Sequence, residues 1–264
     1  MPTTILNSIM ATKQLEIEQL LLTTNIKELE NTLLYKRTCT PLTQLIKAKN
    51  GISIIAEYKR KSPSKGIINA DANVLHTCTG YQAAGAVGVS ILTDAQYFGG
   101  SNADVITVRN ALTIPILRKE FIIHPIQVIQ AKAIGADVIL LIASCLTAKQ
   151  VKELSSLAHS IGLQVILEVH TEQELEYITD DIEMVGINNR NLHNFTVKLE
   201  HSISMLLKIQ PHKLVIAESG IANISDIVLL KKNGFNNFLI GEMLMKTNDP
   251  AYTLSTLLQQ ANAA

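Results

Sequence analysis

Eight short apolar runs rich in β-branched residues recur along the chain, and a segment with helical spacing follows each of them. Strands that alternate with helices pair in parallel through crossover connections. The chain has 264 residues and is 47% hydrophobic, which is enough for one large core. We therefore expect an α/β fold of the (β/α)8 TIM barrel type, with strands at 52–58, 86–92, 114–117, 137–142, 163–167, 184–187, 214–217 and 237–240.

Glycines mark the ends of the segments with helical spacing. Gly85, Gly135, Gly162 and Gly234 each stand one or two residues before a predicted strand. Helices commonly end in a left-handed glycine at this position. An open, doubly wound sheet is the alternative fold, but eight strands without a Gly-rich dinucleotide fingerprint favour the barrel. The predicted helices cover residues 73–84, 102–112, 126–134, 147–160, 171–178, 200–209, 224–233 and 250–258.

Residues 1–50 precede the eight units and form a predicted N-terminal helical extension. Amphipathic patterns predict helices at 9–22 and 26–34, and a third follows Pro41 at 42–48. Two interpretations remain open at this point: the extension covers the bottom of the barrel, or it packs near a functional site. We expect residues 1–264 to form one barrel domain that includes this extension.

Charge and cysteine content limit the classes of partner. Lys plus Arg equals Asp plus Glu at 23 each, so the net charge is zero and gives no electrostatic case for nucleic acid or an anionic membrane. Cys39, Cys78 and Cys145 show no ligand spacing, which favours a reducing, cytoplasmic compartment. No signal-peptide pattern is visible, and the apolar run 138–143 is far short of the ~20 residues of a membrane span. We expect a monomer or a weak homodimer.

Charged and polar side chains stand where the predicted strands end. In barrels of this class the site lies at the carboxyl ends of the strands. Side chains two residues apart share a face of a strand, so Glu57 and Lys59 should point the same way. Isolated charges are costly in a core, so this convergence indicates a site. By the same alternation, we expect inward-pointing side chains at Lys119, Glu168, Asn188 and Arg190, with Ser219 at the seventh exit.

Two glycine turns indicate anion binding. Gly220 follows Ser219 and precedes a predicted helix, and Gly241 follows the last strand. Backbone N–H groups at such turns suit a phosphate group, and phosphate sites after strands 7 and 8 recur in this architecture. Other chemistries lack support, because there is no HExxH metal motif and no Walker loop. We expect His170 to face away from the interior.

Taken together, these motifs resemble the indole-3-glycerol phosphate synthase family. The most specific stretches are IAEYKRKSPSKG at 55–66 and PILRKEFII at 115–123. The remaining matching stretches are 90–94, 97–101, 135–142, 167–170, 186–192, 218–221 and 239–242. The resemblance implies ring closure of 1-(2-carboxyphenylamino)-1-deoxyribulose 5-phosphate to indole-3-glycerol phosphate, with loss of carbon dioxide and water. It implies a phosphorylated small-molecule substrate and neither a metal nor an organic cofactor.

The same resemblance assigns roles to residues of this chain. Lys119 is expected to protonate the substrate carbonyl, and Glu168, Lys59 and Glu57 to share the dehydration. Asn188 and Ser219 would orient the substrate, while Lys59 and Arg190 would hold its carboxylate. Ser62 would support the first loop, and the anilino ring would be enclosed by Phe98, Phe121 and Leu140. The phosphate would be held by the backbone N–H groups of Gly220, Gly241 and Glu242.

Some positions depart from the family pattern, and other functions compete. Glu120 replaces the usual Asp, Tyr58 replaces an aliphatic residue, and Asn191 replaces an acid. Residues 124–126, after strand 3, also differ. Glu120 and Tyr58 are expected to point outward.

Phosphoribosylanthranilate isomerase is an alternative, but it normally uses a Cys at the end of strand 1, where Glu57 and Lys59 stand. A barrel that binds a phosphate ligand without turnover is a third possibility, against which the four charged residues at 57, 59, 119 and 168 weigh.

Overall fold

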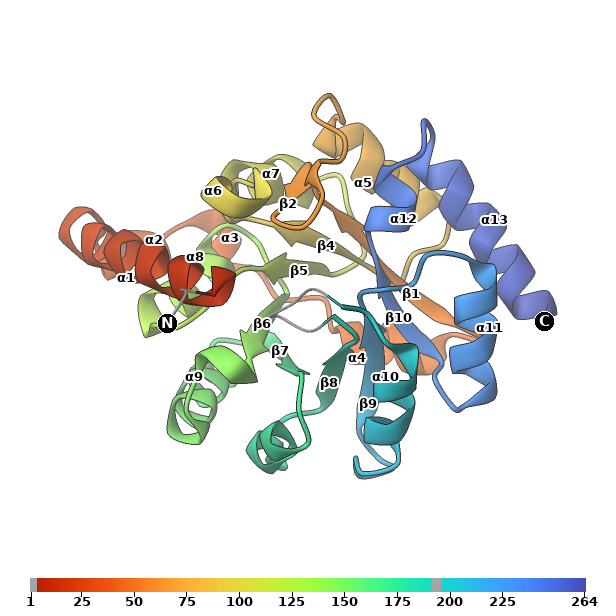
Figure 1. Cartoon of the computed structure of the whole chain (residues 1–264). Coiled ribbons are helices and arrows are strands. Elements are labelled where there is room, and N and C mark those ends of the chain that lie inside the picture. Colours follow the sequence, from red (N-terminus) through yellow and green to blue (C-terminus); the bar gives the residue numbers. More distant parts are fainter. Residues whose placement is uncertain (1–3, 191–195) are drawn as a thin grey trace.

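The computed structural model describes residues 4–190 and 196–264, and its centre is a closed barrel of eight parallel strands (Figure 1). The first strand pairs with both the second and the last, which closes the sheet. This confirms the predicted (β/α)8 architecture. The strands are β1 (Ser53–Tyr58), β4 (Gly88–Leu92), β5 (Ile116–Lys119), β6 (Val138–Ile142), β7 (Gln164–Val169), β8 (Met184–Asn188), β9 (Leu214–Glu218) and β10 (Asn237–Ile240).

Four strands extend further at their carboxyl ends than the apolar runs predict. Lys119 pairs with Leu92, Glu168 with Ile142, and Asn188 with Glu218. These polar residues therefore lie in the ladders and not in the loops that follow. Backbone pairing fixes their direction, so each side chain is held by the sheet itself.

The helices around the barrel are α5 (Val74–Ala83), α7 (Asn102–Arg109), α8 (Pro125–Ala133), α9 (Ala148–Ser160), α10 (Leu199–Leu206), α11 (Ile224–Lys232) and α13 (Pro250–Ala263). One predicted helix, 171–178, is wrong: only the 3-10 segment η2 (Gln173–Tyr177) forms there. None of its residues is buried, so little packing stabilises a longer helix. The glycine stops are confirmed, because Gly85, Gly135, Gly162 and Gly234 all have positive φ angles.

Short elements occupy the loops above the carboxyl ends of the strands. A two-stranded hairpin, β2 (Lys61–Ser62) with β3 (Gly66–Ile67), follows β1 directly. The helices α6 (Ala95–Phe98) and α12 (Glu242–Met245) and the 3-10 turn η1 (Ala143–Cys145) follow β4, β10 and β6. These elements have only two to four residues, which is too short for periodicity to reveal them in the sequence.

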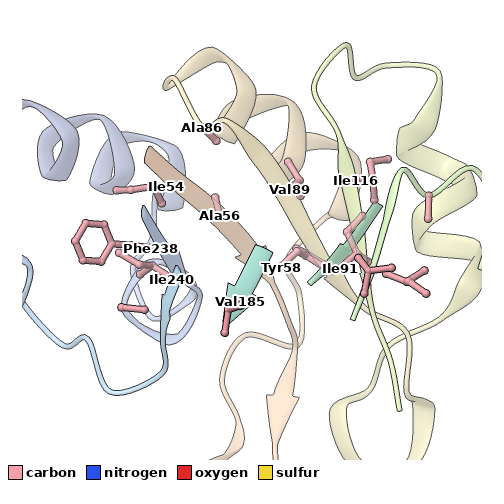
Figure 2. Close-up of a cluster of buried hydrophobic side chains, with 14 of the residues drawn as sticks. Ile54, Ala56, Tyr58, Ala86, Val89, Ile91, Ile116, Val185, Phe238 and Ile240 are labelled. Carbon is pink, nitrogen blue, oxygen red and sulfur yellow. The ribbon is translucent and has the colours of Figure 1, made fainter. Parts of the chain in front are cut away.

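The apolar side chains form two clusters separated by the sheet. The larger lies between strands and helices, and Figure 2 shows part of it, including Tyr58. Tyr58 is buried there and its hydroxyl donates to the Ala72 carbonyl at 2.6 Å, so it points outward as expected. The smaller cluster fills the barrel interior with Ile55, Leu117, Leu140, Ile166, Ile216 and Leu239.

The N-terminal extension has a role at each end of the barrel. Helix α4 (Leu42–Ala48) covers the bottom, where Leu42 and Ile46 join the interior cluster and Thr43 exchanges hydrogen bonds with Gln164. The other extension helices are α1 (Ile5–Thr23), α2 (Ile26–Glu30) and α3 (Leu33–Lys36), so the predicted helix 26–34 is divided in two. Helix α1 lies at the opposite end. Both open interpretations of the extension therefore apply, each to a different helix. No helix within 4–190 or 196–264 has the length and apolar character that a membrane crossing requires.

Candidate active site

A cavity of about 560 Å³ opens at the carboxyl ends of the strands. Every residue predicted for the site lines this one cavity, together with residues of α1. Among these predicted residues, the charged and polar ones are Glu57, Lys59, Ser62, Lys119, Glu168, Asn188, Arg190, Ser219 and Glu242, and the others are Phe98, Phe121, Leu140, Gly220 and Gly241.

Lys119 stands among three carboxylates. Its Nζ lies 2.6 Å from Glu218 Oε2 and 3.6 Å from an oxygen of both Glu57 and Glu168. Burial alone would lower the pKa of this ammonium, but the three carboxylates outweigh burial and raise it well above its usual value. Lys119 is therefore protonated at neutral pH.

Glu57 is paired with the second lysine of the site. Lys59 Nζ donates to Glu57 Oε1 at 2.6 Å. Burial favours the neutral acid, yet the positive charges of Lys59 and Lys119 dominate and lower the pKa of Glu57. Gly241 makes this arrangement possible, because a Cβ there would lie 2.3 Å from Glu57 Oε1.

Glu218 is a site residue that the sequence interpretation missed. It is completely buried, its Oε2 accepts from Lys119, and its Oε1 has no hydrogen-bond partner among the described residues. Burial and the nearby Glu168 charge raise the pKa of Glu218 to about 7, although Lys119 opposes the shift. Gly186 leaves room for the carboxylate, since a Cβ there would lie 2.1 Å from Oε1. Alternation with the inward-pointing Ile216 was the available signal.

Glu168 is held by neighbours on both sides. Asn188 Nδ2 donates to its Oε1 at 2.9 Å, and His170 Nε2 lies 3.2 Å from the same oxygen. Burial would raise the pKa of Glu168, but Lys119, followed by His170 and Asn188, lowers it strongly. Glu168 is therefore ionised at neutral pH.

The expectation that His170 faces away from Glu168 is wrong, although His170 stays outside the cavity lining. His170 is two residues after Glu168, so strand alternation places both side chains on one face, although β7 itself ends at Val169. The chain turns there because the Glu174 carboxylate accepts hydrogen bonds from the backbone N–H groups of His170 and Thr171. The imidazole lies on the Glu168 side, with Nε2 3.2 Å from Glu168 Oε1.

Arg190 connects two loops at the rim of the cavity. Its Nη1 donates to Ser64 Oγ at 2.7 Å in the tip of the β2–β3 hairpin, and its Nη2 donates to Glu242 Oε2 at 3.3 Å. Its backbone N–H donates to Asn188 Oδ1 at 2.9 Å. The guanidinium is thus fixed at the mouth of the cavity with its donors directed along the rim.

Hydroxyl groups and glycines complete the polar lining. The Ser62 hydroxyl is buried without a hydrogen-bond partner among the described residues. Ser219 has a φ of 62°, the left-handed conformation that L-residues rarely adopt, and Gly220 follows at 74°. This turn brings residues 219–222 to the cavity beside Gly241 and Glu242.

An apolar wall forms another part of the cavity lining. The Phe98 and Phe121 rings lie with centroids 6.1 Å apart and planes tilted by 40°, and Leu140 of β6 lies at the same cavity. Asp94 caps α6 by accepting from the backbone N–H groups of Tyr97 and Phe98, which fixes the first ring. Helix α1 adds Ile5, Leu6 and Ile9.

A model of the family described as indole-3-glycerol phosphate synthase matches residues 6–257. The chain belongs to this family. Among curated proteins, the indole-3-glycerol phosphate synthase of Bacteroides thetaiotaomicron is 40% identical over 255 residues, covering 97% of this chain and 98% of that protein. The synthase of Polynucleobacter asymbioticus is 44% identical over 205 residues, covering 77% of each.

Solved structures agree on the architecture of this synthase-family chain. Tryptophan synthase subunit alpha from Legionella pneumophila has a TM-score of 0.61 at 13% identity, covering 84% of this chain and 97% of that one. For 3-hexulose-6-phosphate synthase from Salmonella typhimurium the TM-score is 0.61 at 11% identity, covering 80% of this chain and all of that one. At these identities the likeness establishes the barrel fold alone.

One departure from the synthase-family pattern has a structural account. Glu120 points away from the interior as expected, where its carboxylate accepts from Thr93 Oγ1 at 2.6 Å and meets Lys13 Nζ at 3.1 Å. Lys13, on α1, is only 2% exposed and also contacts Asp94 at 2.7 Å. This buried lysine is a second residue that the sequence interpretation missed.

The remaining departures are local. His124 caps α8 by accepting from the backbone N–H of Ile126, so the altered segment still begins the helix. Asn191, at the other departure, lies outside the described residues.

Proposed function

We propose that this chain catalyses the ring closure of 1-(2-carboxyphenylamino)-1-deoxyribulose 5-phosphate to indole-3-glycerol phosphate, with loss of carbon dioxide and water, as a carboxy-lyase of tryptophan biosynthesis. The observation that carries the proposal is the match to the synthase family over residues 6–257. A cavity that brings together Lys59, Lys119, Glu57 and Glu168, with the buried Glu218 beside Lys119, supports it, because ring closure and dehydration both transfer protons.

Lys119 is the proposed general acid for ring closure. Attack of an aromatic carbon on a ketone requires a proton at the carbonyl oxygen, and Lys119 carries one at neutral pH because three carboxylates stabilise its ammonium. Glu218 lies 2.6 Å from Lys119 Nζ and has its pKa raised to about 7. We assign Glu218 the role of returning a proton to Lys119 after transfer.

Loss of water requires a second acid and base. Glu168, Lys59 and Glu57 are the proposed groups. Lys59 Nζ donates a hydrogen bond to Glu57 Oε1 at 2.6 Å, and Glu168 Oε2 lies 3.6 Å from Lys119 Nζ. That separation exceeds hydrogen-bond length, so a substrate oxygen beside the pair could contact both groups.

The remaining lining residues are proposed to bind the substrate. Arg190 presents a fork suited to a carboxylate, which would replace Ser64 and Glu242 as its partner, with Lys59 as second donor. Asn188 and Ser219 would orient the ribulose chain. Phe98, Phe121 and Leu140 would enclose the anilino ring, Ser62 would support the first loop, and backbone N–H groups of Gly220, Gly241 and Glu242 would hold the phosphate.

The direct test supplies the purified protein with the anilino-deoxyribulose phosphate and follows formation of the indole product by absorbance. We expect turnover without added metal or organic cofactor, and treatment with a chelator should leave the rate unchanged. Absence of product formation in well-folded protein would contradict the proposed function.

Assembly and location complete the proposal. We propose a monomer or weak homodimer that acts in the cytoplasm without nucleic acid or membrane as a partner. The balanced charge of 23 basic and 23 acidic residues and the three free cysteines support this. Sedimentation velocity over a range of protein concentrations tests the first part; a stable higher oligomer at every concentration would contradict it.

A further inference from the structure

His170 lies directly behind Glu168 but not in the cavity. Its side chain is 8% exposed and it is absent from the cavity lining. The ring nitrogens are buried, and neither makes a well-aligned hydrogen bond with the described residues. Nε2 lies 3.2 Å from Glu168 Oε1, and Nδ1 lies 3.9 Å from Glu174 Oε2. A polar ring buried between two carboxylates requires an electrostatic explanation.

The two oxygens of Glu168 have different surroundings. Oε1 meets Asn188 Nδ2 and His170 Nε2, whereas Oε2 faces Lys119 at 3.6 Å. Neighbours of Oε1 therefore fix the rotation of the carboxylate and leave Oε2 directed at the cavity. Without His170, Asn188 alone would hold Oε1, and the carboxylate could rotate toward Lys119.

Several titratable groups surround the imidazole. Glu168 lies two residues earlier in β7, Glu174 on η2 and Glu218 on β9, and His201 on α10 places Nε2 2.8 Å from the His170 carbonyl. Cys145 on η1 is close to both Glu168 and Glu174. Burial lowers the pKa of His170, but Glu168, Glu174 and Glu218 outweigh it and raise the pKa above its usual value. Part of the population therefore carries an imidazolium near neutral pH.

We propose that His170 is a positioning residue for Glu168: it holds Oε1 and keeps Oε2 directed at the substrate during proton transfer. This role rests on the proposed synthase function, since Glu168 acts there as acid or base. His170 touches no reacting atom, so its contribution is to the orientation and charge of Glu168. A misplaced catalytic group of this kind costs on the order of 10- to 100-fold in rate.

The kinetic test compares His170→Leu with His170→Gln, whose amide can approach the position of Nε2. For His170→Leu we expect kcat about 10- to 100-fold lower with KM nearly unchanged. His170→Gln should recover part of kcat. In both variants the acidic limb of the kcat/KM profile should move to higher pH, because Glu168 loses a cation and its pKa rises. The exposed His76→Gln serves as the control. A folded His170→Leu with wild-type kcat and pH profile would overturn the proposal.

A second measurement does not depend on activity or on a stable Leu variant. NMR titration of the imidazole should give a His170 pKa above 6.5 in the full chain, and a lower one in Glu168→Gln, where the carboxylate charge is gone. An unchanged His170 pKa in Glu168→Gln would overturn the pairing, whether or not the protein forms product. A wild-type protein without turnover but with the expected pKa difference would instead contradict only the proposed function.

Discussion

Three buried carboxylates and two lysines meet at the carboxyl end of the barrel, so their charges do not balance when all are ionised. Glu57 and Glu168 have lowered pKa values and remain charged, while Glu218, which is completely buried, has its pKa raised to about 7. A proton on Glu218 brings the cluster to neutrality. The site thus contains one carboxyl group that titrates near neutral pH, which is what proton exchange with Lys119 requires.

Replacing Glu218 by Gln should change how the stability of the protein depends on pH, because the variant lacks this titrating carboxyl group. A carboxyl group whose pKa is higher in the folded state than in the unfolded state gives stability that is present below the unfolded value, near 4.5, and is lost as pH rises through about 7. The thermal midpoint of the wild type should therefore fall relative to Glu218→Gln between about pH 4.5 and 7, and the difference should be constant above that range. Calorimetric scans of both proteins over this pH range measure the difference between their thermal midpoints. A difference that does not vary with pH would contradict the raised pKa of Glu218.

Lys119→Ala tests the proposed general acid. Removing a positioned acid typically costs ~10²- to 10⁴-fold in rate. We expect kcat to fall by that factor while substrate still binds, because Arg190 and the phosphate-binding turns remain. Stopped-flow turnover and equilibrium titration separate the two effects. Lys47→Ala, an exposed lysine on α4, is the matched control. Retained turnover in Lys119→Ala would show that another group supplies the proton.

At the scale of elements, helix α1 is attached to the barrel by a buried charge. Lys13 reaches Asp94 and Glu120, and Thr12 Oγ1 lies 2.9 Å from the Tyr97 hydroxyl. Asp94 caps α6, which carries Phe98, and Glu120 accepts from the backbone N–H of Phe121. The same ion pairs therefore fix the helix and the aromatic wall beside the cavity.

Lys13→Met should release α1 without opening the barrel. Removing one partner of a buried ion pair leaves an uncompensated charge and costs about 3–5 kcal/mol. Here we expect that cost to weaken the docking of α1 onto the barrel. Amide hydrogen exchange should accelerate in α1, and KM should rise more than kcat falls, because the cavity loses the wall formed by Ile5, Leu6 and Ile9. Lys27→Met, an exposed lysine on α2, should change neither. Unaltered exchange in α1 of Lys13→Met would show that apolar packing alone docks it.

For the whole molecule, the sequence predicted the order of strands and the glycine stops, because both depend on local periodicity and backbone conformation. Parity within strands also placed Lys119 and Glu168 correctly. The same rule places His170 on the face of Glu168, two residues earlier, so the expectation that it faces away was contrary to the rule and is wrong. Lys13 could not be found in this way, since its partners are about 80 and 107 residues away and only the closed barrel brings them together.

Closure of the barrel also joins the two ends of the fold. Ile52, just before β1, is fully buried, and its backbone N–H donates at 3.0 Å to the Asn262 side chain at the end of α13. Asn262→Ala should lower the free energy of unfolding by about 1 kcal/mol, because this N–H then has only water as a partner. The urea midpoint should fall with the m-value unchanged, since no other surface becomes exposed. Gln259→Ala, at an exposed position of the same helix, controls for the change to alanine. Equal stability of Asn262→Ala and wild type would mean that the apolar contacts of α13 hold the last helix to the first strand without this hydrogen bond.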